Sequence, residues 1–177
     1  MLAWLMLAWL MLLSWPALAQ DAPSAVYGTW ASSGTMIEVS PAGEGLSARI
    51  LSLKHPHWRD KDGVGRIGET KTDLHNPDPA LRGRPLIGVE LLEGFRFRNG
   101  RWRGRLYVPT NGSTWTASAR VRNGVLEIRG YVALPLFGRT ETFVPVRACN
   151  EDILRMLAMV ELPDRPCAAV SATDPGR

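Results

Sequence analysis

Three Asn-Gly dipeptides recur every 12 residues in the middle of this 177-residue chain: Asn99-Gly100, Asn111-Gly112 and Asn123-Gly124. Asn-Gly between alternating apolar residues is typical of a two-residue hairpin turn, because both residues tolerate a positive φ. The period leaves about ten residues for each strand. The segment from about residue 91 to residue 132 is therefore predicted to form four long antiparallel strands.

The register of these strands follows from counting residue pairs outward from each turn. The second turn places Val108 opposite Trp115, and the first turn places Glu93 opposite Leu106 on the apolar face. A carboxylate there either lies at a barrel rim or, if buried, has a raised pKa and is a candidate acid or ligand contact. All three turns collect the apolar side chains on one face: Phe95, Phe97, Trp102, Leu106, Val108, Trp115, Val121, Leu126, Ile128 and Val132.

The opposite face of the predicted sheet is rich in arginine. Between positions 95 and 131 there are eight arginines, no lysine and one carboxylate, Glu127. Such a face is either a solvated surface whose long stems cover apolar area, or an anion-binding surface, because guanidinium groups match phosphate and carboxylate. We call it the arginine face, and its members are Arg96, Arg98, Arg101, Arg103, Arg105, Arg120, Arg122 and Arg129.

The first 19 residues contain no charged side chain and end in Ala17-Leu18-Ala19. An apolar segment that ends in small residues is typical of a secretory signal peptide. An uncleaved membrane anchor is the alternative, since 19 apolar residues can span a bilayer. Pro16 and the small residues favour cleavage. We therefore expect an exported protein, located in the periplasm or secreted.

The end of the chain holds the only two cysteines, Cys149 and Cys167. In an exported protein they are expected to pair. Asn150 is a predicted N-cap for an apolar helix that extends to about Leu162. This helix is expected to pack on the rest of the protein, with a dimer contact or a membrane surface as alternatives. Residues 148–177 are thus predicted to be a disulfide-bracketed helix followed by a flexible tail.

Four further strand-like segments flank the central meander. Three precede it, at about residues 26–30, 36–39 and 46–53, and one follows it at 139–146. About eight long antiparallel strands tend to close, because closure removes the exposed edges. Residues 20–147 are therefore predicted to form an all-β, up-and-down barrel of roughly eight strands.

Gly28-Thr29-Trp30, at the start of the first strand, resembles the Gly-x-Trp signature of lipocalins. In those barrels the tryptophan lies at the closed end, beneath an arginine from the last strand. The resemblance implies that Trp30 lies at the barrel base. Arg147 is the candidate partner, because Pro145 stands where the related sequences place their arginine.

Three longer segments carry a more specific resemblance: DLHNPDPALRGRPLIG (73–88), GRLYVPTNGSTWTA (104–117) and IRGYVALPLFGRTETF (128–143). They are similar to domain-of-unknown-function family 2147, whose members are exported bacterial proteins. The resemblance implies a lipocalin-like barrel located in the bacterial envelope, with no established function. Val108 departs from the family, which usually has aspartate at that position.

The connection from residue 54 to residue 88 is predicted to be lid-like. Thirty-five residues between strands exceed the usual loop length, and such loops are commonly binding lids or disordered. Its polar side chains either cap turns and pair with one another, or present an arginine to an anionic ligand at the barrel mouth. These residues are Asp73, Asn76, Asp78, Arg82 and Arg84.

All three histidines, His55, His57 and His75, lie in the same connection. Their spacing matches no standard metal-ligand pattern, so we expect no metal site and no cofactor. The sequence contains no recognisable catalytic arrangement, and it leaves enzymatic activity undecided while favouring a binding role.

Small residues on the apolar face, Gly104, Ala117, Ala119 and Gly130, leave room inside the barrel unless Trp30, Trp102 or Trp115 fills it. We therefore expect a small apolar or amphipathic ligand. The alternative is an envelope interaction protein whose arginine face docks on anionic lipid or an acidic partner. Nucleic acid is not expected, and the sequence does not indicate an oligomeric state. The residues expected to contact the ligand are Asp73, Asn76, Asp78, Arg82, Arg84, Trp102, Trp115 and Tyr131.

Overall fold

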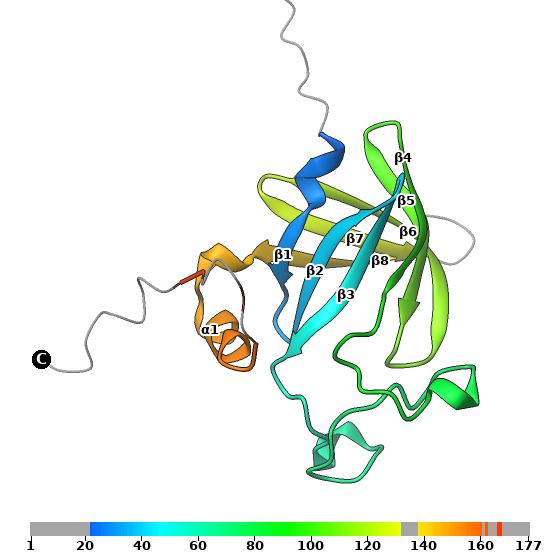
Figure 1. Cartoon of the computed structure of the whole chain (residues 1–177), viewed down its shortest axis with the longest axis vertical. Helices are drawn as coiled ribbons and strands as arrows, with labels where there is room; N and C mark the ends of the chain where they lie inside the picture. The colour runs from blue at the N-terminus through cyan, green and yellow to red at the C-terminus, as the bar shows by residue number, and fades with distance from the viewer. Residues whose placement is uncertain (1–21, 132–137, 161, 163–165, 168–177) are drawn as a thin grey trace, which may run out of the picture.

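Eight antiparallel strands form one sheet that curls into a nearly closed barrel (Figure 1). The computed structural model describes residues 22–131, 138–160, 162 and 166–167. The strand order is β3-β2-β1-β8-β7-β6-β5-β4. The predicted all-β, up-and-down barrel with a C-terminal helix is thereby confirmed. The strands are β1 (Gly28–Ala31), β2 (Thr35–Ala42), β3 (Gly45–Leu53), β4 (Leu92–Arg98), β5 (Arg101–Val108), β6 (Ser113–Arg122), β7 (Val125–Tyr131) and β8 (Gly138–Pro145).

The barrel closes through residues 88–91, which lie between β3 and β5. The amide of Leu91 donates to the carbonyl of Ala48 at 2.7 Å, and the amide of Tyr107 donates to the carbonyl of Leu91 at 2.8 Å. This short segment leads directly into β4 and hydrogen-bonds to β3 on one side and to β5 on the other. The residues that join the 54–88 connection to β4 are therefore part of the barrel wall.

The first and third Asn-Gly turns have the predicted register. Phe97 lies opposite Trp102, and Val121 lies opposite Leu126. Asn99 and Asn123 both have a positive φ, of 51° and 52°, as a two-residue turn requires.

The second turn is longer than predicted. Val108 lies opposite Ser113, not Trp115, and Leu106 pairs with Trp115. Pro109 has no N–H to donate to a ladder, so the pairing stops at Val108 and four residues form the turn. The predicted register was wrong by two residues. A shift of two keeps every side chain on its predicted face.

A β-bulge in β4 moves Glu93 to the outer face. Gly94 has a φ of 62°, and the register shifts between Glu93 and Arg96. Glu93 consequently lies opposite Arg105, with which it forms an ion pair, and Leu92 takes the position opposite Leu106. The prediction of Glu93 on the apolar face was wrong, because the extra residue of a bulge reverses the alternation.

One end of the barrel is covered by the 3-10 turn η1 (Pro23–Val26). The indole N–H of Trp30 donates to the carbonyl of Val26 at 2.9 Å, and that of Trp102 donates to the carbonyl of Pro23 at 3.0 Å. Both tryptophans are buried. Arg147 is instead exposed in the turn η5 (Val146–Ala148), beyond the strand on which it was expected to meet Trp30.

The C-terminal helix α1 (Glu151–Leu157) packs outside the barrel. The side-chain oxygen of Asn150 accepts from the amide of Ile153 at 2.9 Å, so the predicted N-cap is present. Ile153 and Met156 are buried in an apolar cluster with Ala31 of β1 and Met36 of β2. Packing on the barrel, the first of the predicted alternatives, is what the structure shows. The helix ends before the predicted position 162.

The two cysteines are bonded, with a Cα–Cα distance of 5.5 Å. The disulfide ties the residues after α1 to the start of the helix. The predicted signal peptide (1–19), most of the predicted tail (168–177) and Val132 lie outside the described residues. None of the helices in the described part of the chain has the length and apolarity needed to span a membrane.

Reducing the disulfide is expected to loosen α1 while the barrel stays folded, because the last strand ends before Cys149. Circular dichroism would follow the sheet, and an apolar dye would report newly exposed surface. The double variant Cys149→Ser with Cys167→Ser should behave like the reduced protein. Loss of the sheet signal on reduction, or free thiols in the oxidised and denatured protein, would contradict this expectation.

Candidate functional site

The 54–88 connection lies at the barrel end opposite η1 (Figure 1). It forms two lobes, which contain the 3-10 turns η2 (Asp60–Asp62) and η3 (Pro79–Leu81). In the first lobe Asp62 pairs with Arg59 at 3.1 Å and with Lys71 at 2.9 Å. Hydrogen bonds from Arg59 and Lys71 hold the pKa of the Asp62 carboxyl well below its usual range. The first lobe is therefore held together by ion pairs between its own residues.

The second lobe is fastened to the barrel through a buried carboxylate. Asp73 is fully buried and accepts hydrogen bonds from three side chains. The hydroxyl of Tyr107 on β5 donates at 2.6 Å, the amide of Asn76 at 2.7 Å and the guanidinium of Arg84 at 2.8 Å. Only Tyr107 comes from the barrel wall, so its bond to Asp73 links the connection to the barrel. We call these four residues the Asp73 latch.

The protonation states in the latch follow from burial and hydrogen bonding. Burial by itself raises the pKa of the Asp73 carboxyl, but the hydrogen bonds from Tyr107, Asn76 and Arg84 outweigh it and hold that pKa below its usual value. Burial, together with the bond to Asp73, raises the pKa of the Tyr107 hydroxyl to about 12. At neutral pH the latch is thus an ionised carboxylate that accepts from a neutral phenol.

The other polar residues of the second lobe bind one another or the backbone. The carboxylate of Asp78 caps η3 by accepting from the amide of Ala80 at 3.0 Å. The guanidinium of Arg82 donates to the carbonyl of Asn76 at 2.8 Å. The structure therefore brings together the five polar residues singled out in the sequence, in the arrangement in which they cap turns and pair with each other. Their role as ligand contacts stays a prediction.

Tyr107 was missed in the sequence, although it lies in one of the segments quoted for the family resemblance. A second contact joins the same two segments, because a Cβ atom on Gly112 would lie 1.8 Å from the carbonyl oxygen of His75. Two segments that are separate in the sequence, 73–88 and 104–117, therefore meet at this end of the barrel.

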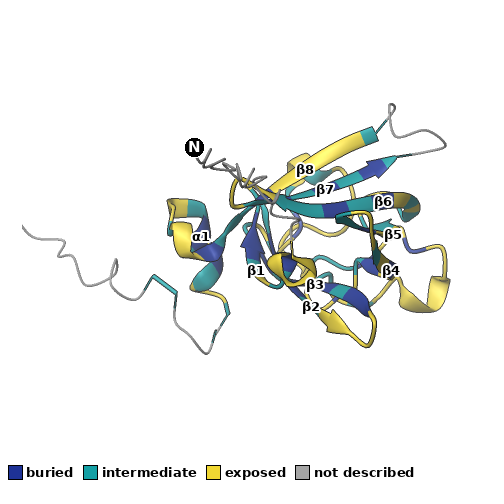
Figure 2. Ribbon diagram, turned by 90° about the horizontal axis from the view of Figure 1, so that it is seen from above, coloured by how far each residue is buried: buried dark blue, intermediate teal, exposed yellow. Residues whose placement is uncertain are grey.

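The side chains on the inner face of the meander differ in burial. Toward η1, Trp102, Ala119 and Leu126 are buried, while Phe97 and Val121 are half-buried. Toward the 54–88 connection Leu106, Val108 and Trp115 are only half-buried. Figure 2 shows buried and intermediate positions along several strands and exposed positions along β8 and in the connections. One end is thus covered by η1 together with the buried Trp30 and Trp102, and the inner face under the connection has three half-buried apolar side chains.

Aromatic side chains occupy part of the space that the small inner residues leave. A Cβ atom on Gly104 would lie 2.3 Å from the ring of Phe95, and one on Gly130 would lie 3.1 Å from the ring of Trp115. Trp115 is one of the three tryptophans considered for this space.

The predicted ligand contacts are divided between the two barrel ends. Trp115 lies under the connection, whereas Trp102 is buried at the end covered by η1. Tyr131 pairs with Thr116 at the last position of β7, on the face opposite Ala117 and Gly130. Of the three aromatic residues predicted to contact a ligand, only Trp115 is on the inner face at the end covered by the connection.

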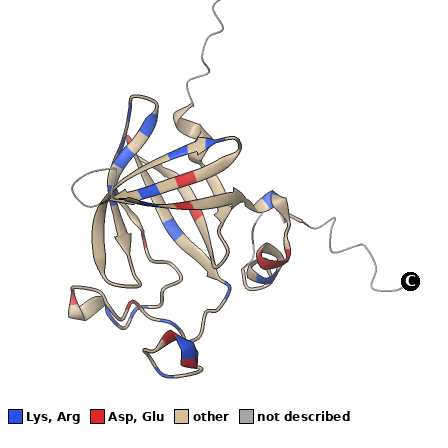
Figure 3. Cartoon of the chain, turned by 180° about the vertical axis from the view of Figure 1, so that it is seen from behind, with Lys and Arg blue, Asp and Glu red and all other residues tan. Residues whose placement is uncertain are grey.

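The arginine face lies outside the barrel, as the register predicted, and Figure 3 shows basic residues along the β4–β5 hairpin and the neighbouring strands. Among the described residues, Arg105 forms an ion pair with Glu93, and Arg120 forms one with Glu127. Arg96 and Arg103 donate to backbone carbonyls. Three members make no ion pair or side-chain hydrogen bond with any described residue: Arg98, Arg101 and Arg122.

The three histidines of the connection are exposed. Within the described ranges, no group of three or more His, Cys, Asp or Glu side chains is arranged to hold a metal ion.

The fold defines the class of the protein as a lipocalin-like barrel. Protein HP1028 from Helicobacter pylori, described as belonging to the lipocalin family, has a similar structure. The TM-score is 0.54 at 19% sequence identity, and the match covers 77% of this chain and 90% of that one.

The chain belongs to the family described as "Uncharacterized protein conserved in bacteria (DUF2147)", whose model matches residues 28–144. No curated protein matches the sequence. The family match ends before Cys149, so the disulfide and α1 lie outside it.

Proposed function

We propose that this protein binds a small apolar or amphipathic ligand, which enters the barrel at the end covered by the 54–88 connection. The observation that carries the proposal is the difference between the two barrel ends. Leu106, Val108 and Trp115 are half-buried under the connection, while the other end is covered by η1 and the buried Trp30 and Trp102. A concave, apolar site with a few polar groups at its rim is typical of small-molecule binding.

The composition of the connection supports an apolar ligand. Among the described residues, six large apolar side chains are exposed, and five of them lie in this connection. Exposed apolar residues gathered in one segment indicate an interaction site more often than scattered ones do. The five are Val64, Ile67, Leu74, Leu81 and Ile87.

We further propose that the protein works in the periplasm or outside the cell. The support is the disulfide, since disulfides persist in oxidising compartments, together with the predicted signal peptide.

Binding is testable with the apolar fluorophore N-phenyl-1-naphthylamine and protein that starts at residue 20. We expect saturable binding of one probe molecule per barrel. Trp115→Leu should weaken it about tenfold, because an aromatic contact at the mouth is lost. Mass spectrometry of protein isolated from its native host should also find a co-purifying apolar molecule.

Phe97→Leu is the matched control. Phe97 is also a half-buried aromatic residue of the inner face, but it lies next to Trp102 at the opposite end. Its replacement should leave probe binding unchanged. The proposal fails if the wild-type protein shows no saturable binding, or if both substitutions weaken binding equally.

A further inference from the structure

The β4–β5 hairpin carries opposed arginines on its outer face. Arg98 lies directly opposite Arg101, and Arg96 lies opposite Arg103 at the next outward-facing position. Like charges that face each other across a strand pair destabilise a sheet. An anionic partner outside the protein would relieve this repulsion.

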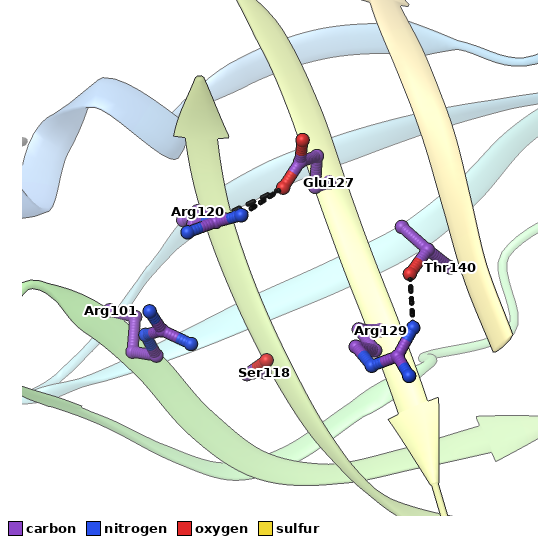
Figure 4. A pocket seen from close by; sticks show the side chains of 6 residues that line it. All are labelled: Arg101, Ser118, Arg120, Glu127, Arg129 and Thr140. Atoms are coloured by element: carbon purple, nitrogen blue, oxygen red, sulfur yellow. Dashed lines mark hydrogen bonds and ion pairs between the residues drawn. The ribbon is translucent and has the colours of Figure 1, made fainter. Parts of the chain in front are cut away.

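The carboxylates of the same four strands are already occupied. Strands β4 to β7 contain two, of which Glu93 pairs with Arg105 and Glu127 pairs with Arg120. Figure 4 shows Glu127 bound to Arg120, with Arg101 on the neighbouring strand away from that carboxylate. Neither carboxylate therefore neutralises the opposed arginines of the hairpin.

Five members of the arginine face thus form no ion pair with any described residue, and we call them the uncompensated arginines. Two of the five donate to backbone carbonyls, which are neutral. Four are exposed, and Arg101 is half-buried. The uncompensated arginines are Arg96, Arg98, Arg101, Arg103 and Arg122.

The apolar side chains of the hairpin tip point into the barrel. Between positions 96 and 103 they are Phe97 and Trp102, which lie opposite each other and belong to the core cluster. The outer face of this tip consequently offers charge and no apolar group that could enter hydrocarbon. A partner held by this surface would be held by electrostatic attraction, which salt weakens.

The hairpin lies at the barrel end that η1 covers, away from the 54–88 connection (Figure 1). The bond from the Trp102 indole to the carbonyl of Pro23 holds the hairpin next to η1. A partner on the uncompensated arginines would therefore leave the proposed entrance for an apolar ligand free.

We propose that the uncompensated arginines dock this protein on the surface of a bilayer that contains anionic phospholipid. Clusters of about four to eight basic residues are typical of proteins that bind anionic membranes. The guanidinium group also matches phosphate in geometry. The five charges come from β4, β5 and β6, so they are spread in two dimensions, as the headgroups of a bilayer are. A linear acidic polymer would follow one row of them.

The test is co-sedimentation with vesicles, using protein that starts at residue 20 so that the apolar N-terminal segment does not contribute. At an ionic strength of about 0.1 M, charges interact over about 10 Å. We expect binding to vesicles of phosphatidylglycerol mixed equally with phosphatidylcholine, none to phosphatidylcholine alone, and a steep loss as salt is added. The triple variant Arg98→Gln, Arg101→Gln and Arg103→Gln should bind about a hundredfold more weakly, since each basic residue contributes about fivefold.

A triple variant at the other basic positions is the matched control. Lys61→Gln, Arg66→Gln and Arg155→Gln remove the same net charge from exposed residues outside the arginine face. Binding should change by less than about threefold, because these charges lie beyond the screened range of the docked surface. Equal weakening by the two triple variants would overturn the proposal, since it would indicate attraction by net charge alone.

Two further measurements separate a bilayer from other anions. Lysine at positions 98, 101 and 103 should retain most of the binding, because attraction to a charged surface depends on charge; a loss as large as with glutamine would indicate a specific phosphate site and contradict the proposal. The proposal is also wrong if the wild-type protein does not prefer the mixed vesicles, or if it binds soluble polyphosphate and no vesicles. Thermal unfolding would verify folding, and the glutamine variant should unfold no earlier than the wild type, since an opposed pair of charges is removed.

Discussion

Replacing Asp73 with asparagine is expected to lower the free energy of unfolding by about 3 kcal/mol, because three donors lose a buried carboxylate acceptor. The NH2 group of the new side chain would take the place of one carboxylate oxygen, so it would face either Tyr107 or the pair Asn76 and Arg84, all of which donate to Asp73 in the wild type. The second lobe should separate from β5 before the barrel unfolds. Chemical denaturation would give the free energy, and hydrogen exchange would show faster exchange over residues 71–88.

Asp78→Asn is the matched control for this substitution. Asp78 lies in the same lobe, but it is exposed and caps a short turn. Asparagine is as good an N-cap as aspartate, so stability should change by less than about 0.5 kcal/mol. Equal losses in the two variants would show that the buried latch has no special role.

The pH dependence of stability provides a second measurement on the latch. The pKa of Asp73 is lowered in the folded protein. The ionised carboxylate therefore stabilises the fold at a pH above the unfolded pKa of about 3.9, and this stabilisation is lost as the pH falls through the folded pKa. The pKa of Tyr107 is raised to about 12. The neutral hydroxyl therefore stabilises the fold below about pH 10, and this stabilisation is lost as the pH rises toward 12. Asp73→Asn should remove the acidic part of this dependence.

Replacing Gly112 with alanine should have the second largest effect, a loss of about 3 kcal/mol. Its φ of 69° is unfavourable for alanine, and the added Cβ would overlap the backbone of His75. Backbone cannot move aside as a flexible side chain can. The β5–β6 turn and the second lobe should therefore separate, with faster hydrogen exchange in both segments.

Gly124→Ala isolates the backbone contribution. Gly124 has a nearly equal φ of 75°, but a Cβ atom there would meet nothing within 4 Å. Only the conformational penalty remains, about 1 kcal/mol. If Gly112→Ala is no more destabilising than Gly124→Ala, the contact between the turn and the second lobe does not stabilise the fold.

Local turn chemistry explains why so much of the meander was predictable. The turns at Asn99 and Asn123 adopt the backbone conformation that Asn-Gly favours, and they set the register on either side. The second turn departs because Pro109 ends the ladder early. The bulge at Gly94 placed Glu93 on the outer face, where counting from the turn had predicted the inner face. An isolated glycine within a strand is a sign of such a bulge, but counting residue pairs outward from the turns does not take it into account.

The candidate site was only partly predictable, because its partners are distant in sequence. Asp73, Asn76 and Arg84 lie close together in one loop, and their density singled them out. Tyr107 joins them only after the barrel has folded, so no local pattern marks it. Trp102 was expected among the ligand contacts, but hydrogen bonding to Pro23 places it beneath η1. Pairing across the barrel, unlike a turn, leaves no short-range signature.

The seam between β1 and β8 has a consequence for the order of assembly. Only two residue pairs join these strands, Trp30 with Pro145 and Ala31 with Val144, and α1 packs beside them. The strands come from opposite ends of the family-matched region, so their loop closes only after nearly the whole chain has been synthesised. Until then β1 and the nascent sheet keep open edges that can pair with other chains. Because α1 packs beside this seam, we expect the folding chain to be most prone to aggregate before α1 has docked.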